Sequence, residues 1–377
     1  MKKCAMSVAL AVFATSPALA ADHCIEQHDA WLQAAELGPY QPETEDWDAI
    51  LEAAKTEPGL TIYASTSRVL NVVDEMNEIH GLNMEALNVS TNELIERVRR
   101  EWDAGLRNVG LVNNGNPGQM LEQLVERCAI TNYVPREIAE RIRPEEALPL
   151  LRHRYSVGTW YYSSDEGEVP YSNIWDLTTE DFRNRVVVND PMDSGTMMEV
   201  FTAFIMNDAE LERLYEERFG NAIELTTENA GYEFWKRMLD NDLRIVSGAR
   251  DVAQTVTEAD GVMVGLSTQS LYRNVIEGIY DFELDTQIAP TVLTLRLMGI
   301  GMESDSPNQA KLMVRHLMSQ DGGSPWWGAD FPVDPAIEPT GLMADLTLNS
   351  FATLWEPRVE DQIAVRDDFI DFYLTYR

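Results

Sequence analysis

Basic residues are scarce in this 377-residue sequence: 29 lysines and arginines stand against 63 aspartates and glutamates, and the formal net charge is −34. A field of this sign repels nucleic acid and anionic membranes, so we expect neither as a partner. The acidic residues are scattered instead of gathered in blocks. This distribution is typical of a solvated surface and does not identify a ligand.

Cysteine and histidine are also scarce, with three and five residues. The histidines are far apart and form neither an i, i+4 pair nor part of a Cys-x-x-Cys arrangement, so we expect no metal site and no cofactor. The sequence has no G-x-S-x-G elbow, and "NGNPGQ" lacks the lysine and hydroxyl residue of a phosphate-binding P-loop. Ser194 could act as a nucleophile only if a distant histidine reached it, so we expect a protein that is not an enzyme.

Long uncharged apolar runs are absent after the first 20 residues, "MKKCAMSVALAVFATSPALA", which begin with a basic end, continue with a short apolar run and end on Ala-Leu-Ala. This layout predicts a signal peptide at residues 1–20, whose apolar run is too short to span a membrane. We therefore expect a soluble chain in the periplasm. Its two remaining thiols, Cys24 and Cys128, favour one disulfide in that oxidising compartment, against the alternative of two unconnected buried cysteines.

One local unit recurs along the chain: an apolar strand, a short polar turn and an amphipathic helix. In "GLTIYASTSRVLNVVDEMNEIHG", residues 60–64 read as the strand, and Val69, Leu70, Val73 and Met76 as the buried helical face. Four further units are "VGLVNNGNPGQMLEQLVERC", "RVVVNDPMDSGTMMEV", "LRIVSGARDVAQTV" and "GVMVGLSTQSLYRNVIEG". Strands that alternate with helices predict an α/β fold with largely parallel sheets.

The polar turns of these units are the best site candidates, because ligands of such sheets bind beyond the carboxyl ends of the strands. Asn116 fits the N-cap of a helix in the second unit. In the third, Thr196 and Glu199 fit a capping box, which leaves Ser194 and Gly195 ahead of it with open backbone N–H groups for an anion. The alternative for each turn is that its polar residues only cap the helix or form the turn and bind no ligand.

Three arginines lie in or beside these turns: Arg68, Arg250 and Arg273. An arginine next to exposed helix N–H groups can clamp a carboxylate or phosphate, because its planar fork donates two parallel hydrogen bonds. A surface ion pair is the more common role of any single arginine. Of the three we favour Arg250.

The order of these features resembles that of periplasmic solute-binding proteins of ABC importers (type II), in the group that includes ferric-ion, phosphonate and sugar-phosphate binders. The resemblance covers residues 45–340 and rests on "WDAILEAAKTEPGLTIYAST", "AITNYVP", "YSNIWDLTTEDFRNRVVVNDPMDSGT", "VAQTVTEADGVMVGLS" and "WWGADFPVDPAI" in that order. It implies a two-lobed α/β periplasmic binding protein fold with a ligand cleft between the lobes. Lobe one would comprise residues 21–157 plus 287–377, and lobe two residues 158–286, with crossing strands near "RYSVGTWYY" and "APTVLTLRL".

The same resemblance implies a monomer that captures a small-molecule solute by lobe closure and delivers it to an ABC permease in the inner membrane. It also implies a set of ligand-binding residues on the polar turns: Ser65, Thr66, Ser67, Arg68, Asn113, Asn114, Ser194, Gly195, Thr196, Arg250, Ser267, Thr268 and Tyr272.

The solute class follows from a departure from the ferric-ion binders. Those proteins carry two adjacent tyrosines where this chain has Ser267 and Thr268, so the anionic oxygens that a trivalent cation prefers are missing. Hydroxyls, amides and an arginine instead suit a small anionic or zwitterionic organic solute, namely a phosphonate, phosphate ester, sulfonate or carboxylate. The alternatives are a ferric-ion or metal-chelate binder that uses Tyr272 and scattered acids and, less favoured, a periplasmic serine hydrolase or a ligand-sensing module.

Overall fold

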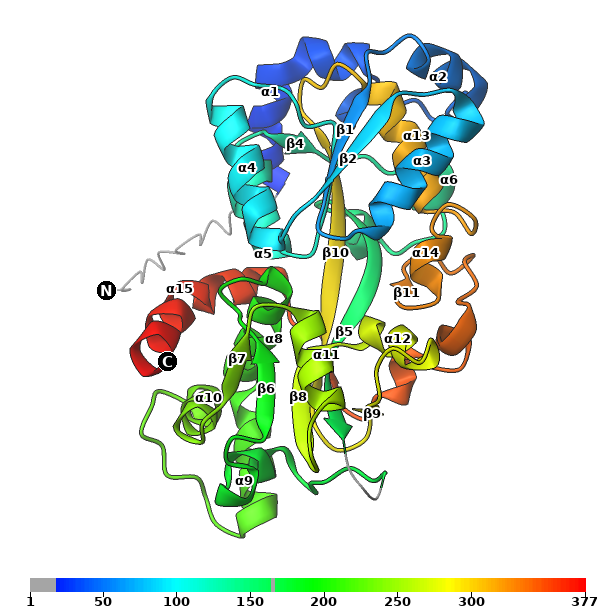
Figure 1. Cartoon of the computed structure of the whole chain (residues 1–377). Coiled ribbons are helices and arrows are strands. Elements are labelled where there is room, and N and C mark those ends of the chain that lie inside the picture. The colour runs from blue at the N-terminus through cyan, green and yellow to red at the C-terminus, as the bar shows by residue number, and fades with distance from the viewer. Residues whose placement is uncertain (1–17, 164–166) are drawn as a thin grey trace, which may run out of the picture.

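The computed structural model describes residues 18–163 and 167–377, so residues 1–17 of the expected signal peptide lie outside the described part. Within that part, none of the helices combines the length and apolar character that a bilayer crossing needs. Two α/β halves, one above the other in Figure 1, are joined by long strands that run through both.

A single mixed sheet contains the strands of both halves. Its strands are β1 (Leu60–Ala64), β2 (Met84–Asn88), β3 (Leu111–Asn114), β4 (Ile130–Thr131), β5 (Leu151–Ser163), β6 (Val186–Asn189), β7 (Arg244–Val246), β8 (Met263–Thr268), β9 (Glu283–Asp285), β10 (Thr291–Gly301), β11 (Phe331–Pro332) and β12 (Leu354–Trp355). The main order is β2-β1-β3-β10-β5-β8-β6-β7. The strands β1, β2 and β3 are parallel, as are β6, β7 and β8, whereas β10 and β5 join the two sets through antiparallel pairs.

Helices pack around the sheet in both halves (Figure 1). They are α1 (Ala18–Ala34), α2 (Trp47–Ala54), α3 (Arg68–His80), α4 (Thr91–Asp103), α5 (Pro117–Gln119), α6 (Arg136–Ala139), α7 (Pro144–Ala147), α8 (Gly195–Met206), α9 (Asp208–Phe219), α10 (Ala230–Asp240), α11 (Ala249–Thr257), α12 (Tyr272–Ile276), α13 (Pro307–Leu317), α14 (Ser324–Trp327) and α15 (Val359–Tyr376). Short 3-10 helices lie at Gly38–Tyr40, Ile174–Thr178, Glu180–Phe182, Gln269–Leu271, Gly341–Ala344 and Leu348–Ser350, and a π-helix at Met120–Val125 continues α5.

The first predicted unit shows why the local sequence folds as it does. The strand over residues 60–64 is confirmed as β1. The helix α3 buries Val69, Val72, Val73 and Met76, which share one face because they recur at intervals of three and four residues. The prediction for Leu70 was wrong: its side chain is 42% exposed, since it lies about 100° around the helix from Val69.

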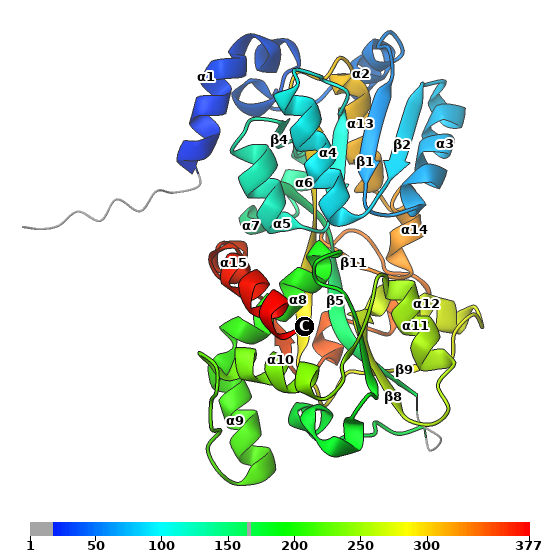
Figure 2. The same cartoon turned by 60° about the vertical axis from the view of Figure 1, so that its left-hand side comes forward.

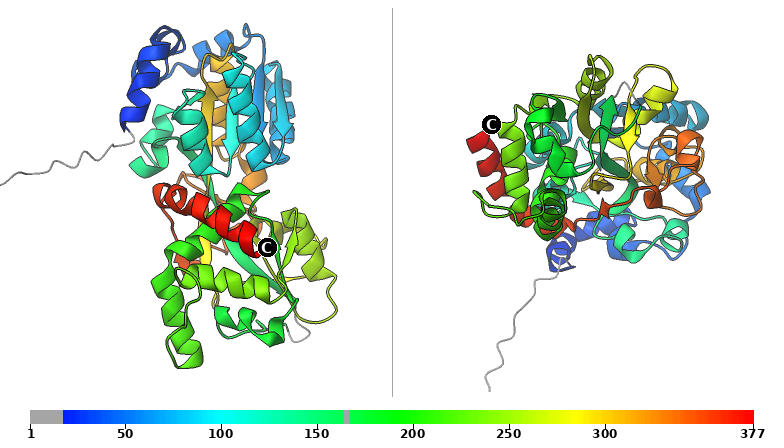
Figure 3. Two further views of the ribbon diagram at one scale, coloured as in Figure 1. Left: turned by 90° about the vertical axis from the view of Figure 1, so that its left-hand side faces the viewer. Right: turned by 90° about the horizontal axis from the view of Figure 1, so that it is seen from below.

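The hydrophobic core divides between the halves. One cluster fills the space around β1, β3, α3 and α13, and a second lies around α8, α10 and β6. Trp355, Phe369 and Tyr373, all near the carboxyl end, belong to the second cluster, and α15 lies beside α8 (Figures 2 and 3). We therefore propose that residues 354–377 move with lobe two, although the predicted division placed all of 287–377 in lobe one.

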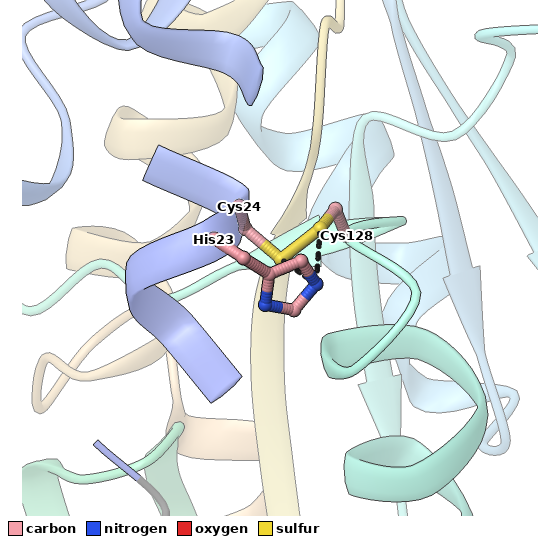
Figure 4. A group of neighbouring side chains, drawn as sticks. All are labelled: His23, Cys24 and Cys128. Atoms are coloured by element: carbon pink, nitrogen blue, oxygen red, sulfur yellow. Dashed lines mark hydrogen bonds between the residues drawn. A yellow bond between two sulfur atoms is a disulfide. The ribbon is translucent and has the colours of Figure 1, made fainter. Parts of the chain in front are cut away.

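A disulfide ties α1 to the first half. Cys24 and Cys128 are bonded, as the sequence predicted, and Figure 4 shows the imidazole of His23 beside them. The Nε2 atom of His23 lies 3.3 Å from Sγ of Cys128. These three side chains are close enough together to hold a metal ion, but both sulfurs are in the disulfide and offer no thiolate.

Candidate ligand site

The carboxyl ends of β1 and β3 bring the first two polar turns together. The Ser65 N–H donates to the carbonyl of Asn113 at 3.2 Å. The side-chain amide of buried Asn113 donates to Nδ1 of His153 on β5 at 3.0 Å. Thr66 is half-buried, and Ser67 is exposed at the start of α3. These turns therefore meet at the crossing strand β5.

Four arginines from separate segments gather around the buried carboxylate of Asp330, which precedes β11. Nη1 of Arg68, the first residue of α3, lies 2.6 Å from Oδ2 of Asp330. Nε of Arg154 on β5 lies 3.3 Å from the same oxygen, and Arg296 is its partner in the β5–β10 register. The charge of Arg273 on α12 interacts with Arg68 and Asp330. We call these four arginines and Asp330 the arginine cluster.

Burial and mutual repulsion shape the electrostatics of the arginine cluster. Burial lowers the pKa of Arg154 to about 9. The attraction of Asp330 opposes this shift, whereas repulsion from Arg296 and Arg68 adds to it. Burial also lowers the pKa of Arg296 and of Arg273. Burial alone would raise the pKa of Asp330, but the charges of Arg68, Arg154 and Arg296 outweigh it and lower that pKa. At neutral pH the cluster therefore has more guanidinium charge than Asp330 can neutralise.

Neighbouring groups hold the two strand arginines in place. The guanidinium of Arg154 lies over the ring of Trp326 at 5.1 Å, and its Nη1 donates to Nδ1 of His153 at 2.6 Å. Burial and the charge of Arg154 lower the pKa of His153 well below its usual range, so this imidazole is a neutral acceptor. Gly115 makes room for Arg296, because a Cβ at residue 115 would lie 2.4 Å from Nη1 of Arg296.

The arginine favoured by the sequence lies at the edge of this arrangement. Arg250 is exposed in the first turn of α11, and its charge contributes to the lowered pKa of Arg273. It therefore approaches the arginine cluster from the second half. Arg273 lies deeper than Arg250, and its Nη1 donates to the carbonyl of Ser270 at 2.8 Å.

The start of α8 is engaged by the first half. The Gly195 N–H donates to Oγ1 of Thr91 at 2.8 Å, and Oγ1 of Thr196 donates to the carbonyl of Gly115 at 3.2 Å. We call these two hydrogen bonds the α4–α8 contact. The sequence predicts that the Gly195 N–H is open for an anion. In this conformation the N–H instead donates to a protein partner.

The caps at these helix starts were predicted in part. Asn116 is confirmed as the N-cap of α5. The capping box of Thr196 and Glu199 was wrong: Ser194 is the N-cap, and its Oγ accepts from the Met197 N–H at 3.3 Å. Glu199 is instead fully buried near Arg296, and burial raises its pKa well above the usual range.

The last polar turn touches the loop that carries Asp330. Ser267 is buried at the end of β8, and Oγ1 of Thr268 lies 3.1 Å from Oγ of Ser270. From this turn to the loop, the side-chain amide of Gln269 donates to the carbonyl of Ala329 at 3.0 Å. This hydrogen bond ties the residue that follows β8 to Ala329, the residue before Asp330.

Two of the predicted residues make contacts away from the arginine cluster. The hydroxyl of Tyr272 donates to Oε2 of Glu283 at 3.0 Å, and its ring packs against Phe282. The side-chain amide of Asn114 donates to the carbonyl of Thr91 at 2.9 Å, beside the α4–α8 contact. Neither contact involves a residue of the arginine cluster.

Sequence reasoning missed Arg154, Arg296 and Asp330. A signal for the two arginines was present, because "LRHRYSVGTWYY" and "TVLTLRLMGI" each place a cation within an apolar strand. Such a cation, once buried, needs a partner or a function. Nothing local distinguished Asp330 from the other acidic residues, since its partners are far away in sequence.

No protein-family model matches the sequence, and neither does a curated protein. Solved structures do match in fold. Iron-bound HitA from Pseudomonas aeruginosa has 12% identity and a TM-score of 0.67, over 84% of this chain and 99% of that one. The ferric binding protein from Campylobacter jejuni has 14% identity and a TM-score of 0.65, over 84% and 99%. AfuA from Actinobacillus pleuropneumoniae, with exogenous fructose-6-phosphate bound, has 15% identity and a TM-score of 0.65, over 85% and 98%.

At these identities the similarity establishes the fold. AfuA is described as a periplasmic binding protein, and another match, from Agrobacterium tumefaciens, as the substrate binding protein of an ABC transporter. None of these four is described as an enzyme. The chain therefore has the two-lobed α/β fold of the periplasmic substrate-binding proteins that serve ABC transporters, as the resemblance implied.

Proposed function

We propose that this protein is the periplasmic solute-binding component of an ABC importer and that its solute is a small organic anion. The observation that carries the proposal is the arginine cluster. Arg68, Arg154, Arg273 and Arg296 come from both halves and from the crossing strands, yet they share the single carboxylate of Asp330. A phosphate ester, phosphonate, sulfonate or carboxylate supplies the missing negative charge and accepts paired hydrogen bonds.

The ferric-ion alternative finds less support. A hard trivalent cation needs anionic oxygens, whereas the carboxylate of Asp330 is already paired with two arginines. The phenol of Tyr272 is bonded to Glu283, and burial together with that carboxylate raises the pKa of Tyr272 to about 12. The matched proteins include both an iron-bound and a sugar-phosphate-bound example, so they do not favour either solute.

The hydrolase alternative is also disfavoured, because the hydroxyl of Ser194 caps α8. We further propose that the lobes close on the solute as the matched fold permits, and that the closed monomer is what the permease recognises. In this scheme Arg250, Ser267 and Thr268 approach the solute from lobe two. Ser65, Thr66 and Ser67 approach it from lobe one.

Thermal-shift titration tests the proposed solute class. Organic phosphates, phosphonates, sulfonates and carboxylates are compared with ferric citrate. A ligand at 100 times its Kd stabilises the native state by about 2.7 kcal/mol, so binding is visible as a rise in melting temperature. Arg273→Gln should weaken anion binding about tenfold, as loss of one charged hydrogen bond does. Arg185→Gln is the matched control, because Arg185 also donates to a backbone carbonyl, that of Val262, but far from the cluster. A shift with ferric citrate and none with the organic anions would overturn the proposal.

A further inference from the structure

A cavity of about 1160 Å³ lies behind the crossing strand β10, away from the arginine cluster. Leu293, Leu295 and Leu297 line it from β10. Neighbouring side chains of a strand point to opposite faces, so Arg296 and the cavity are on different sides of β10. Further apolar residues complete the wall, among them Ile25, Leu121, Leu148 and Val359.

The charge of this lining differs from that of the chain. Four arginines and three glutamates line the cavity, whereas acidic residues outnumber basic ones by about two to one in the whole sequence. Arg136 donates to the backbone carbonyls of Pro42 and Gln41, which are neutral. Within residues 18–163 and 167–377, Arg152 has no carboxylate within ion-pair distance. Arg136 and Arg152 thus form no ion pair in that range, and neither do Glu356 and Glu360 of the same lining.

We propose that this cavity binds a free amphiphile with one linear hydrocarbon chain and one carboxylate, of the long-chain fatty acid class. Arg152 is opposite Leu297 in the β5–β10 register, so a carboxylate paired with Arg152 starts the hydrocarbon chain at Leu297. The leucines then provide about 13 Å of apolar wall toward Leu293, at about 3.3 Å per residue. The volume slightly exceeds the usual range of ligand sites, about 300 to 1,000 Å³, which suits a long flexible ligand.

The test is a titration of residues 21–377, the chain without its expected signal peptide, with palmitate, followed by displacement of a fluorescent fatty acid. Micromolar or tighter binding is expected for the unaltered protein. Arg152→Gln should weaken palmitate binding about tenfold and leave hexadecanol binding unchanged, because the alcohol has no charge for Arg152 to pair with. Leu148→Asp, at a lining residue that is 61% exposed, should also weaken palmitate binding. Leu106→Asp is the matched control, at a residue 50% exposed that does not line the cavity.

Two outcomes would overturn this proposal. The first is absence of saturable palmitate binding by a protein that still unfolds cooperatively. The second is an equal loss of palmitate and hexadecanol binding in Arg152→Gln. The arginine cluster is not involved in either of these readouts, so the proposed function stands or fails separately.

Discussion

Replacement of Asp330 by asparagine should lower stability and at the same time strengthen anion binding. The change keeps the shape of the side chain but removes the charge that Arg68 and Arg154 contact at 2.6 and 3.3 Å. Breaking a buried ion pair by removing one partner costs about 3 to 5 kcal/mol, because the remaining charge is left uncompensated. Asp330 is almost fully buried, so this full range applies to the ligand-free protein.

Anion affinity should move in the other direction. A carboxylate about 6 Å from a bound anion repels it by about 2.8 kcal/mol at an effective dielectric constant of 20, so its removal strengthens binding by up to about a hundredfold. The unpaired Arg68 and Arg154 also become free to donate to the solute. The two effects partly cancel in the melting temperature of the complex, which should approach that of the unaltered complex.

Asp334→Asn is the matched control for this prediction. Asp334 is as buried as Asp330 and pairs with Arg141 at 2.6 Å, but it lies on a different face of lobe one. Urea unfolding and calorimetric titration of both variants give stability and affinity separately. Weaker anion binding in Asp330→Asn than in Asp334→Asn would refute the reasoning, because it would make Asp330 a ligand for the solute instead of a counter-ion of the arginines.

Two further changes test the framework around the site. Joint replacement of Cys24 and Cys128 by serine opens a loop with a sequence separation of 104 residues, and it should lower the free energy of unfolding by up to about 4.7 kcal/mol. An unchanged urea midpoint would contradict this. Thr91→Val removes the hydroxyl that accepts from Gly195 in the α4–α8 contact, so the ligand-free protein should open and its radius of gyration in X-ray scattering should rise. Thr91→Ser, which keeps the hydroxyl, should not change that radius.

The sequence predicted what depends on neighbours along the chain. The strand at residues 60–64 and the cap at Asn116 follow from local periodicity and side-chain chemistry, and the structure confirms both. The box of Thr196 and Glu199 satisfies the same local rules, yet it does not form. Glu199 is covered by the crossing strand β10 and by α15, and no local pattern contains that information.

The candidate site is harder to predict than the fold because it is assembled from distant segments. Arg68 and Asp330 are 262 residues apart in sequence. The sequence identified the turn at Arg68 because it follows a strand, and it missed Asp330 because one acid among 63 carries no local mark. Arg250 fits the expected pattern of an arginine at a helix start, but it is exposed. Arg273, the second residue of α12, is more buried.

The opposed signs of the global and local charge make the salt dependence of association informative. At long range an organic anion meets a protein of net charge −34, which repels it, and the attraction of the buried arginines acts only within the site. Added salt shortens the screening length from about 30 Å at 0.01 M to about 8 Å at 0.15 M, which weakens the repulsion before the ligand reaches the arginines. The association rate constant of an anionic solute, measured by stopped-flow fluorescence, should therefore rise with salt while its dissociation also accelerates. A cationic ferric species is attracted by the same field, so its association should slow. An association rate that falls with salt for an organic anion would show that the arginine cluster governs the field outside the protein, contrary to this argument.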